Sequence, residues 1–485
     1  MILPILLAIV PTLYHYSNNV EKLTFLNLAR MLVFNVVLAI IVCLALVIFN
    51  PSRPFKAANA SFLFLVFFNI YGFVYRYLLH LDVIRIEHYT VLPVILLLAI
   101  YTILLITNQK QTTLMRIWNN LTWIVSALIR INLIKIVPAE IKRWENDVAT
   151  APLDTLQSVS PTSKTPDIYY IILDEFAGFQ GMRDYWQYKG VDEFVRFLKN
   201  KDFFVAEASH GSSTDTLHQM ATRLNYQEYP WNDDYIQTYF NDIADNRVMK
   251  FLKSRGYTTV VFDETTMGYP SAKSIRADYV YEYGSSAIPQ AEVEVYGFFF
   301  DEFGELVIDN TMLYAISQKY KINNPVISQH RSMISFTVDN IANNEISSPK
   351  FVYVHLLLPH PPFIFDPNGD ITDSSHSVNW NYYIDNYQFS IKVARTMVEN
   401  ILLEADPKNP PVIILQSDHG ARNHLSRIEG SVILQDYPEQ LKTLIMYALY
   451  LPGYDYVDLP QDIDPINTFP IVLNYLFDTD IALSK

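Results

Sequence analysis

Cysteine is almost absent from this sequence. Cys43 is the only one among 485 residues, so no intramolecular disulfide can form, and the lack of bridges says nothing about the compartment. No thiol follows residue 43 to serve as a nucleophile or a metal ligand. Basic residues are also scarce, because 36 Lys and Arg stand against 50 Asp and Glu. Nucleic-acid binders recruit basic surfaces to the phosphate backbone, so this deficit argues against a nucleic-acid partner.

The charge is distributed unevenly along the chain. Residues 1–150 carry 12 Lys and Arg against 6 Asp and Glu, a net charge of +6. The remainder carries 24 against 44, a net charge of −20, and the two parts give the overall −14. Neither part contains an internal repeat or a low-complexity tract. The contrast, together with the length, indicates two domains.

Long apolar runs are confined to the first part. Ile2–Tyr14 is short, and its alternative interpretation is a signal peptide, but it lacks a basic start and a cleavage site, so we favour a spanning helix. Ile117–Ile129, continuing to Ile134, is the weakest run, and its alternative is an amphipathic helix on the membrane surface. Three uncharged runs reach the roughly 20 residues that a bilayer requires: Met31–Phe49, Ala57–Tyr75 and Tyr89–Gln109. We therefore predict a membrane anchor of about five helices over residues 1–145.

The short loops predict the orientation of this anchor. Arg53 and Lys56 lie between the second and third spans, and Lys110 and Arg116 lie between the fourth and fifth. The intervening loop, residues 76–88, balances its basic and acidic residues. The positive-inside rule places the N-terminus and the two basic loops in the cytoplasm. Five spans then deliver everything after about residue 145 to the outer side of the plasma membrane.

The second part of the chain has the pattern of an α/β domain. Residues 146–166 contain several Pro, Ser and Thr and are predicted to be a linker. Strand-like and helix-like runs then alternate through residues 167–485, which predicts a mostly parallel sheet with helices on both faces. The predicted strands are Ile168–Leu173, Phe203–Ala206, Thr258–Phe262, Phe351–Leu358, Val412–Gln416 and Leu444–Leu451. The predicted helices are Asp192–Asn200, Asn246–Arg255, Val326–Asn343, Tyr382–Glu404 and Thr468–Phe477.

Two of the predicted strands end abruptly in acids. The run that ends at Gln416 is followed by Asp418 and His419, and the run that ends at Leu173 is followed by Asp174. Open α/β folds place their chemistry at the carboxyl ends of the strands. Carboxylates and imidazoles are common metal ligands, so these residues predict one metal site. The alternatives are a helix cap or surface charge for Asp174 and a structural Asp–His pair for the other two.

A third element is rich in hydroxyl groups. Ser, Thr and Asp crowd residues 209–216, directly before a helical pattern over Leu217–Leu224. The ordinary interpretation is capping of that helix. The functional interpretation places a hydroxyl at a helix N-terminus, where free N–H groups and the dipole stabilise a bound phosphate. A metal beside it would lower the hydroxyl pKa and make it a nucleophile.

A fourth element is a histidine between prolines. The run Phe351–Leu358 leads into Pro359, His360 and Pro361, which would hold the imidazole rigidly at the same sheet edge. We therefore expect a functional role for His360. His355 lies within the run among apolar neighbours, and we favour a core histidine there.

The order of these elements resembles the alkaline phosphatase superfamily. A strand ending in an acid is followed by a hydroxyl-bearing segment, then by Pro359–Phe363 and finally by Ser417–Gly420. Within the superfamily the chain is similar to the sulfatase-like branch that includes lipoteichoic acid synthases and phosphoethanolamine transferases. The likeness covers about residues 166–478. A five-span anchor with an outward catalytic domain is also similar to those transferases.

The resemblance implies a role for each matched residue. Thr216 matches the nucleophile, which is also a metal ligand, and Thr214 is the alternative if the alignment is shifted by two residues. His360 matches a substrate-contacting histidine. Asp174, Asp418 and His419 match metal ligands. The resemblance also implies one divalent cation, of zinc, manganese or calcium, which activates the nucleophile and neutralises the oxygens of the transferred group.

The chain also departs from the family pattern. True sulfatases carry a Cys or Ser with a following Pro and Arg, and the segment Thr216–Met220 has neither Cys, Pro nor Arg, which disfavours sulfate-ester hydrolysis. The following helix carries His218, Gln219, Thr222 and Arg223 in place of small residues. A second metal would need further ligands, and for the nearby candidate His424 a structural or solvent-exposed role is favoured.

The sequence thus predicts a membrane-anchored, metal-dependent phosphotransferase or phosphodiesterase that acts through a threonine nucleophile. Its partners would be the lipid bilayer and a phospholipid or phosphorylated glycan substrate. Two alternatives stay open. One is a sulfuric ester hydrolase, and the other is an inactive homologue that binds or assembles envelope polysaccharide.

Overall fold

The structure is a computed structural model, and its chain forms two compact units. Unit 1 comprises Met1–Pro152 and Glu292–Val326, and unit 2 comprises Leu153–Ala291 and Ile327–Lys485. The chain therefore leaves the second unit once, enters the first and returns. The structure describes residues 2–20, 23, 25–49, 51–80, 87–148, 165–231, 235–265, 274–282, 302–320, 325–372, 380–422 and 438–484.

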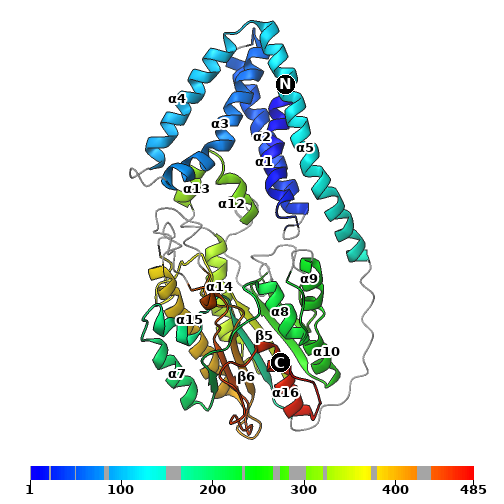
Figure 1. Ribbon diagram of the computed structural model, residues 1–485, viewed down its shortest axis with the longest axis vertical. Helices are drawn as coiled ribbons and strands as arrows, with labels where there is room; N and C mark the ends of the chain where they lie inside the picture. The colour runs from blue at the N-terminus through cyan, green and yellow to red at the C-terminus, as the bar shows by residue number, and fades with distance from the viewer. Residues whose placement is uncertain are drawn as a thin grey trace. The chain divides into compact units, whose positions relative to one another are not determined.

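Unit 1 consists of helices. Three of the described helices contain segments long and apolar enough to cross a membrane, namely Phe25–Ile48, Pro54–Leu78 and His88–Thr107. The number of helices that actually cross stays a prediction. The five N-terminal helices are α1 (Ile2–Ser17), α2 (Phe25–Phe49), α3 (Pro54–His80), α4 (His88–Thr107) and α5 (Gln111–Val148) (Figure 1).

Large apolar side chains cover the outside of these helices. Ile48 and Ile134 are each 72% exposed, and Trp123 is 68% exposed. Exposed apolar area is unfavourable in water by about 25 cal/mol per Å², so a surface of this kind is typical of contact with lipid. Polar contacts lie between the helices, because the Asn35 amide donates to the Thr12 hydroxyl at 2.8 Å. Such buried hydrogen bonds join helices in an apolar medium.

A segment from the middle of the chain packs into unit 1. Residues 302–320 form α12 (Glu302–Ile308) and α13 (Tyr314–Tyr320). The Gly72 amide of α3 donates to Asn310 O at 3.0 Å, and the Met312 amide donates to Phe68 O at 2.9 Å. In a regular helix the Gly72 amide would donate to the Phe68 carbonyl four residues earlier. Here both groups bond to residues 310 and 312 instead, so the segment bonds directly to the backbone of α3. The predicted boundaries 1–145, 146–166 and 167–485 stay a prediction, and residues 149–164 of the predicted linker lie outside the described residues.

Unit 2 is built on a seven-stranded sheet with the order β2-β7-β6-β1-β5-β3-β4. The strands from β6 to β4 in this order run parallel, whereas β7 is antiparallel to both β6 and β2. Their bounds are β1 (Ile168–Leu173), β2 (Phe204–Ala206), β3 (Thr258–Asp263), β4 (Tyr279–Glu282), β5 (Lys350–Leu356), β6 (Val412–Ser417) and β7 (Tyr447–Tyr450).

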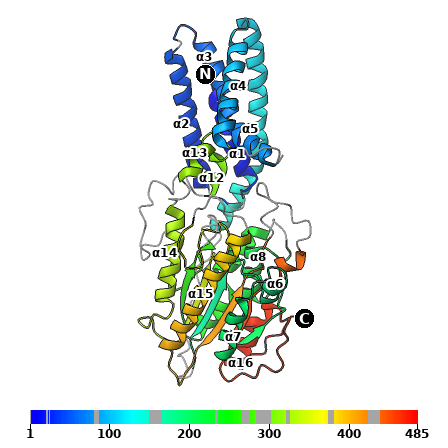
Figure 2. The same cartoon turned by 90° about the vertical axis from the view of Figure 1, so that its left-hand side faces the viewer.

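Helices cover both faces of this sheet (Figures 1 and 2). On one face lie α7 (Val191–Asn200), α14 (Pro325–Asn340) and α15 (Trp380–Glu404). On the other lie α8 (Thr216–Asn225), α10 (Arg247–Ser254) and α16 (Thr468–Phe477). The shorter helices are α6 (Phe179–Asp184) and α9 (Ile236–Ala244), with 3-10 turns at Glu439–Lys442 and Pro465–Asn467.

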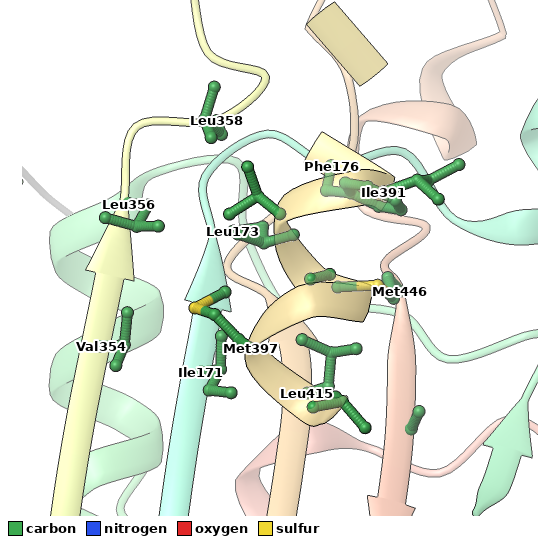
Figure 3. Packing of buried hydrophobic residues seen from close by; sticks show 14 of the residues in the cluster. Ile171, Leu173, Phe176, Val354, Leu356, Leu358, Ile391, Met397, Leu415 and Met446 are labelled. Atoms are coloured by element: carbon green, nitrogen blue, oxygen red, sulfur yellow. The ribbon is translucent and has the colours of Figure 1, made fainter. Parts of the chain in front are cut away.

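The central strands are apolar on both sides because both sides are covered. Ile171 and Leu173 of β1 face the layer that contains α15, where Figure 3 shows them beside Met397. Tyr170 and Ile172 face the layer that contains α8. This arrangement explains why β1 is a continuous apolar run rather than an alternating one.

The predicted fold class is confirmed. Apolar helices precede an α/β domain whose sheet is mostly parallel and sandwiched by helices. Each predicted strand overlaps an observed one. The edge strand β4 and the helices α6, α9, α12 and α13 have no counterpart among the predicted elements.

Candidate metal centre

The ends of β1 and β6 bring two carboxylates together. These strands are parallel neighbours in which Leu173 pairs with Ser417, so the residues that follow, Asp174 and Asp418, leave the sheet at the same level. Both side chains are buried. Asp418 Oδ1 accepts the amides of Glu175 at 3.0 Å and His419 at 2.8 Å. These bonds fix one oxygen of Asp418 and leave its Oδ2 without a hydrogen-bond partner.

His355 joins the two acids from β5. It lies two residues beyond Tyr353, which faces the α8 layer, so its side chain points to that same side of the sheet. Its Nε2 lies 3.6 Å from Asp174 Oδ2, and the side chain is completely buried. The Tyr353 hydroxyl contacts Nδ1 at 3.0 Å. His355 lies in the core as expected, but it is not a fully satisfied histidine, because Nε2 has no hydrogen-bond partner and belongs with Asp174 and Asp418 to a set that can hold a metal ion.

His419 presents one nitrogen to the same point. Its Nδ1 lies 2.8 Å from Gly420 O, and since a carbonyl only accepts, Nδ1 carries the proton. In the neutral ring Nε2 is then unprotonated. That atom lies 3.3 Å from Asp418 Oδ2 and 3.8 Å from Asp174 Oδ1. A lone pair that faces two carboxylate oxygens is unfavourable unless a cation or a proton lies between them.

Electrostatics favour the ionised form of the Asp174 carboxylate. Burial would raise the pKa of Asp174, but the imidazoles of His360, His355 and His419 oppose it and hold the pKa well below 3.8. Burial would lower the pKa of His355, but the contact with the Asp174 carboxylate and its charge outweigh burial, so the His355 pKa is raised above its ordinary value. The Asp174 carboxylate is therefore ionised at neutral pH although its side chain is buried.

The unpartnered atoms fit a divalent cation. Asp174 Oδ1, Asp418 Oδ2 and His355 Nε2 are buried without a hydrogen-bond partner. Leaving such atoms unsatisfied is costly, and a cation coordinated by oxygen and imidazole nitrogen removes that cost. The predicted ligands Asp174, Asp418 and His419 are thus brought to one point, although their role as ligands stays a prediction.

Thr216 lies beside this cluster at the start of α8. The Asp215 side chain caps the helix by accepting the His218 amide at 2.9 Å, which makes Thr216 the first helical residue. Its hydroxyl lies 3.5 Å from His419 Nε2, and the residue is 3% exposed. Thr214 is more exposed. A small cavity of about 20 Å³, lined among others by Thr216 and His355, adjoins the hydroxyl, and this is room for about one water molecule.

His360 also lies close to Asp174. Asp174, Glu175 and His360 form a second set of side chains that can hold a metal ion. The His360 Nδ1 donates to Pro361 O at 2.7 Å, which fixes the ring. Glu175 is buried and adopts a φ of 61°, a left-handed conformation that costs free energy in a residue with a side chain. Its carboxylate accepts the Arg422 amide at 2.6 Å.

Sequence reasoning missed Asp263, which ends β3 next to β5. Its carboxylate is buried and accepts the Thr265 amide at 2.9 Å, and burial raises its pKa. The same signal that identified Asp174, an acid directly after a buried strand, was present here. Next to it, Glu264 accepts the amide of Leu357 at 2.9 Å and contacts His330 Nδ1 at 2.7 Å. The predicted second-metal candidate His424 lies outside the described residues.

Some solved structures are similar to this chain. No curated protein sequence matches it. One similar structure is the C-terminal periplasmic domain of EptC from Escherichia coli in complex with zinc, with 14% identity, 66% of this chain and 84% of that chain covered, and a TM-score of 0.40. Another is lipooligosaccharide phosphoethanolamine transferase A from Neisseria meningitidis, an integral membrane protein. It is 12% identical, 99% of this chain and 95% of that chain are covered, and the TM-score is 0.42.

A third is the lipoteichoic acid synthase LtaP from Listeria monocytogenes, with 13% identity, 66% of this chain and 76% of that chain covered, and a TM-score of 0.36. At these identities and TM-scores, none of the three transfers an activity, a substrate or a metal to this chain.

A family model gives the stronger result. The model of the sulfatase family matches residues 166–446, which is more than half of the 485 residues. The match spans β1, α8, β5 and β6 with the cluster described above. It confirms the resemblance to the sulfatase-like branch of the alkaline phosphatase superfamily, and this chain belongs to the sulfatase family.

Proposed function

We propose that this protein is a membrane-anchored, metal-dependent phosphotransferase or phosphodiesterase whose nucleophile is Thr216. One observation carries the proposal. Buried carboxylate and imidazole atoms without partners surround a point that the Thr216 hydroxyl also faces, at the N-terminus of α8. Asp174, Asp418, His419 and Thr216 would hold the cation, with His355 as a further ligand. When bound, the cation supplies positive charge that lowers the pKa of the hydroxyl and stabilises the oxygens of the transferred group.

The residues of the chain divide the reaction into two steps. In the first, the Thr216 hydroxyl loses its proton to solvent and its Oγ1 attacks the phosphorus of a phosphodiester. The bond to the leaving alkoxide breaks and the alkoxide takes up a proton, which leaves Thr216 esterified to the phosphoryl group and its remaining substituent. In the second, an acceptor hydroxyl or water loses its proton and attacks the same phosphorus, and the threonine oxygen departs and is protonated again. The N-terminus of α8 stabilises the negative charge on the phosphoryl oxygens. His360, fixed by its bond to Pro361 O, contacts the substrate.

The proposed substrate is a phospholipid or a phosphorylated glycan of the cell envelope. The helices of unit 1 support this class, because their exposed apolar side chains hold the chain in a bilayer. We propose that about five helices cross the plasma membrane and that unit 2 lies outside the cytoplasm, following the basic loops at Arg53 and Lys110. Zinc and manganese suit a set of carboxylates and imidazoles, and calcium prefers oxygen ligands alone.

Turnover of a chromogenic phosphodiester by the purified full chain in detergent tests the nucleophile. Thr216→Ala removes the only hydroxyl at the proposed position and is expected to lower turnover by more than about 10³-fold. Thr214→Ala is the matched control and is expected to retain activity. Loss of activity in Thr214→Ala with an active Thr216→Ala would contradict the assignment.

Sulfate-ester hydrolysis is the second candidate, and membership of the sulfatase family favours it. The residue at the proposed nucleophile position is a threonine, which cannot be converted to the formylglycine of true sulfatases. We therefore expect turnover of a chromogenic phosphodiester and none of the matching sulfate ester. Preferential turnover of the sulfate would reverse the order of the two candidates. Absence of both activities from metal-loaded protein would favour an inactive, binding homologue.

A further inference from the structure

Arg223 is a buried cation directly behind the metal centre. It lies on α8 and is 1% exposed. Its Nη1 donates to Ser417 O at 2.6 Å, and its Nη2 donates to Asp418 O at 2.5 Å. The guanidinium thus bonds the main chain of the two residues that carry the Asp418 carboxylate out of the sheet.

The same guanidinium is tied to its own helix. Its Nη2 also donates to Gln219 Oε1 at 3.0 Å, and Gln219 Nε2 donates to Ser213 O at 2.9 Å. Gln219 therefore joins Arg223 to the loop that precedes the proposed nucleophile. Thr216, Gln219 and Arg223 are three and four residues apart, so they lie on one face of α8. That face is the one turned to the ends of β1 and β6.

Burying this charge is costly. The hydrogen bonds to Ser417, Asp418 and Gln219 all go to uncharged oxygens, which offset the desolvation of a guanidinium only in part. An apolar residue would pack at this position without that cost. The cost of burying the cation is offset if the guanidinium positions the Asp418 main chain and its positive charge stabilises the neighbouring carboxylates. Arg presents a rigid planar fork that can bridge two carbonyls and an amide, which the single ammonium of Lys cannot do.

We propose that Arg223 is a positioning residue that sets the distance between the Thr216 hydroxyl and the Asp418 carboxylate, and so shapes the metal centre. This inference rests on the proposed function. It also explains why α8 departs from the small residues expected by family resemblance, because Arg223 and Gln219 form the link between helix and strand end. In this role Arg223 touches neither the cation nor the substrate.

A matched control lies two residues further along the same helix. Asn225 Nδ2 donates to Asp242 O at 3.0 Å, and Asn225 Oδ1 accepts the Arg247 amide at 2.9 Å. Asn225 thus holds the C-terminal end of α8 to the neighbouring helices and has no part in the link to Ser417 and Asp418. A variant here loses buried hydrogen bonds of α8 and leaves the strand end untouched.

The test compares Arg223→Met, Arg223→Lys and Asn225→Ala in the full chain in detergent. The measurements are Zn²⁺ affinity by titration, the visible absorption of the Co²⁺-substituted protein, and the thermal midpoint. Loss of a group that orients metal ligands typically weakens metal binding about 10–100-fold. We expect that loss and an altered Co²⁺ spectrum in Arg223→Met, a smaller loss in Arg223→Lys, and wild-type metal binding in Asn225→Ala despite a lowered midpoint.

Equal Zn²⁺ affinity and an unchanged Co²⁺ spectrum in wild type and Arg223→Met would overturn this role and leave the proposed function intact. If Arg223→Met does not fold, the comparison of Arg223→Lys with Asn225→Ala decides, and wild-type metal binding by the lysine variant overturns the role. A wild-type chain that binds metal but turns over no phosphodiester would contradict the proposed function alone. A wild-type chain that binds no divalent cation would contradict both.

Discussion

At the scale of single residues, the site is defined by atoms that lack partners. The place of Asp174 and Asp418 at one edge of the sheet could be predicted from the sequence, because each comes at the end of a mostly apolar strand. His355 could not, because a histidine inside an apolar strand has the pattern of a core residue. Its place beside Asp174 depends on the register of β5 against β1, in which it pairs with Ile172, one position before the strand ends. That register is a long-range property that no local pattern contains.

His355 offers a direct test of this distinction. His355→Gln keeps a polar side chain in the core and removes the imidazole Nε2 that faces Asp174. We expect the Zn²⁺ affinity of the folded variant to fall by at least about tenfold. Tyr353→Phe, which removes only the hydroxyl that contacts Nδ1, is the control, and its Zn²⁺ affinity should fall less than that of His355→Gln. An unchanged Zn²⁺ affinity in His355→Gln would return this residue to a purely structural role.

Asp278 provides a pH-dependent contribution to stability away from the site. Its carboxylate accepts the Thr259 amide at 2.8 Å and pairs with Lys253 Nζ at 2.9 Å. Burial would raise its pKa, but these bonds outweigh that and lower the pKa below its ordinary value of 3.8. A lowered folded-state pKa stabilises the protein above pH 3.8, and this stabilisation is lost as the pH falls through the folded-state pKa.

Denaturant unfolding of wild type and Asp278→Asn should therefore show a stability difference at pH 7 that shrinks below about pH 4. A difference that stays constant across this range would show that the contribution of Asp278 does not come from its charge.

At the scale of elements, the sheet could be predicted more fully than the segment over residues 302–320. Strand runs such as β1 and β6 are continuous apolar stretches because both of their faces are covered. Residues 302–320 have no such signature. Their place in unit 1 depends on bonds to α3, such as that from the Met312 amide to Phe68 O, across more than 200 positions of the chain.

Gly72 of α3 is required for that packing. A Cβ atom at this position would lie 1.8 Å from Asp309 O, a backbone atom that must then move. Gly72→Ala gains about 1 kcal/mol of helix propensity, but the clash is expected to displace the segment at a net cost of about 1–3 kcal/mol. Hydrogen exchange at the amides of residues 310–314 should accelerate in Gly72→Ala. Asn69→Ala, on the same helix, is the control, and equal protection in both variants would contradict this role for Gly72.

At the scale of the whole molecule, the sequence predicts a membrane anchor and an outward catalytic domain. Helix length and composition could be predicted because apolar runs are a local property. The number of crossings could not, because α1 is short and α5 is a single helix of 38 residues with mixed polarity. The side of the membrane on which each loop lies rests on the few basic residues near Arg53 and Lys110.

The single cysteine makes this orientation testable. In a Cys43→Ser background, Ser52→Cys tests a predicted cytoplasmic loop, and Val457→Cys tests unit 2, where Val457 is 84% exposed. We expect a membrane-impermeant maleimide to label Val457→Cys in intact cells and Ser52→Cys only after the cells are opened. The reverse pattern of labelling would contradict the proposed topology.

The central claim is that the Thr216 hydroxyl attacks phosphorus at a metal centre built by the ends of β1 and β6. Mass spectrometry of the metal-loaded protein, quenched in acid during turnover of a phosphodiester, tests it most directly. The account predicts a phosphoryl-containing adduct on Thr216, which disappears in Asp418→Ala together with the bound metal. An active enzyme whose adduct lies on Thr214 or on another residue would contradict it.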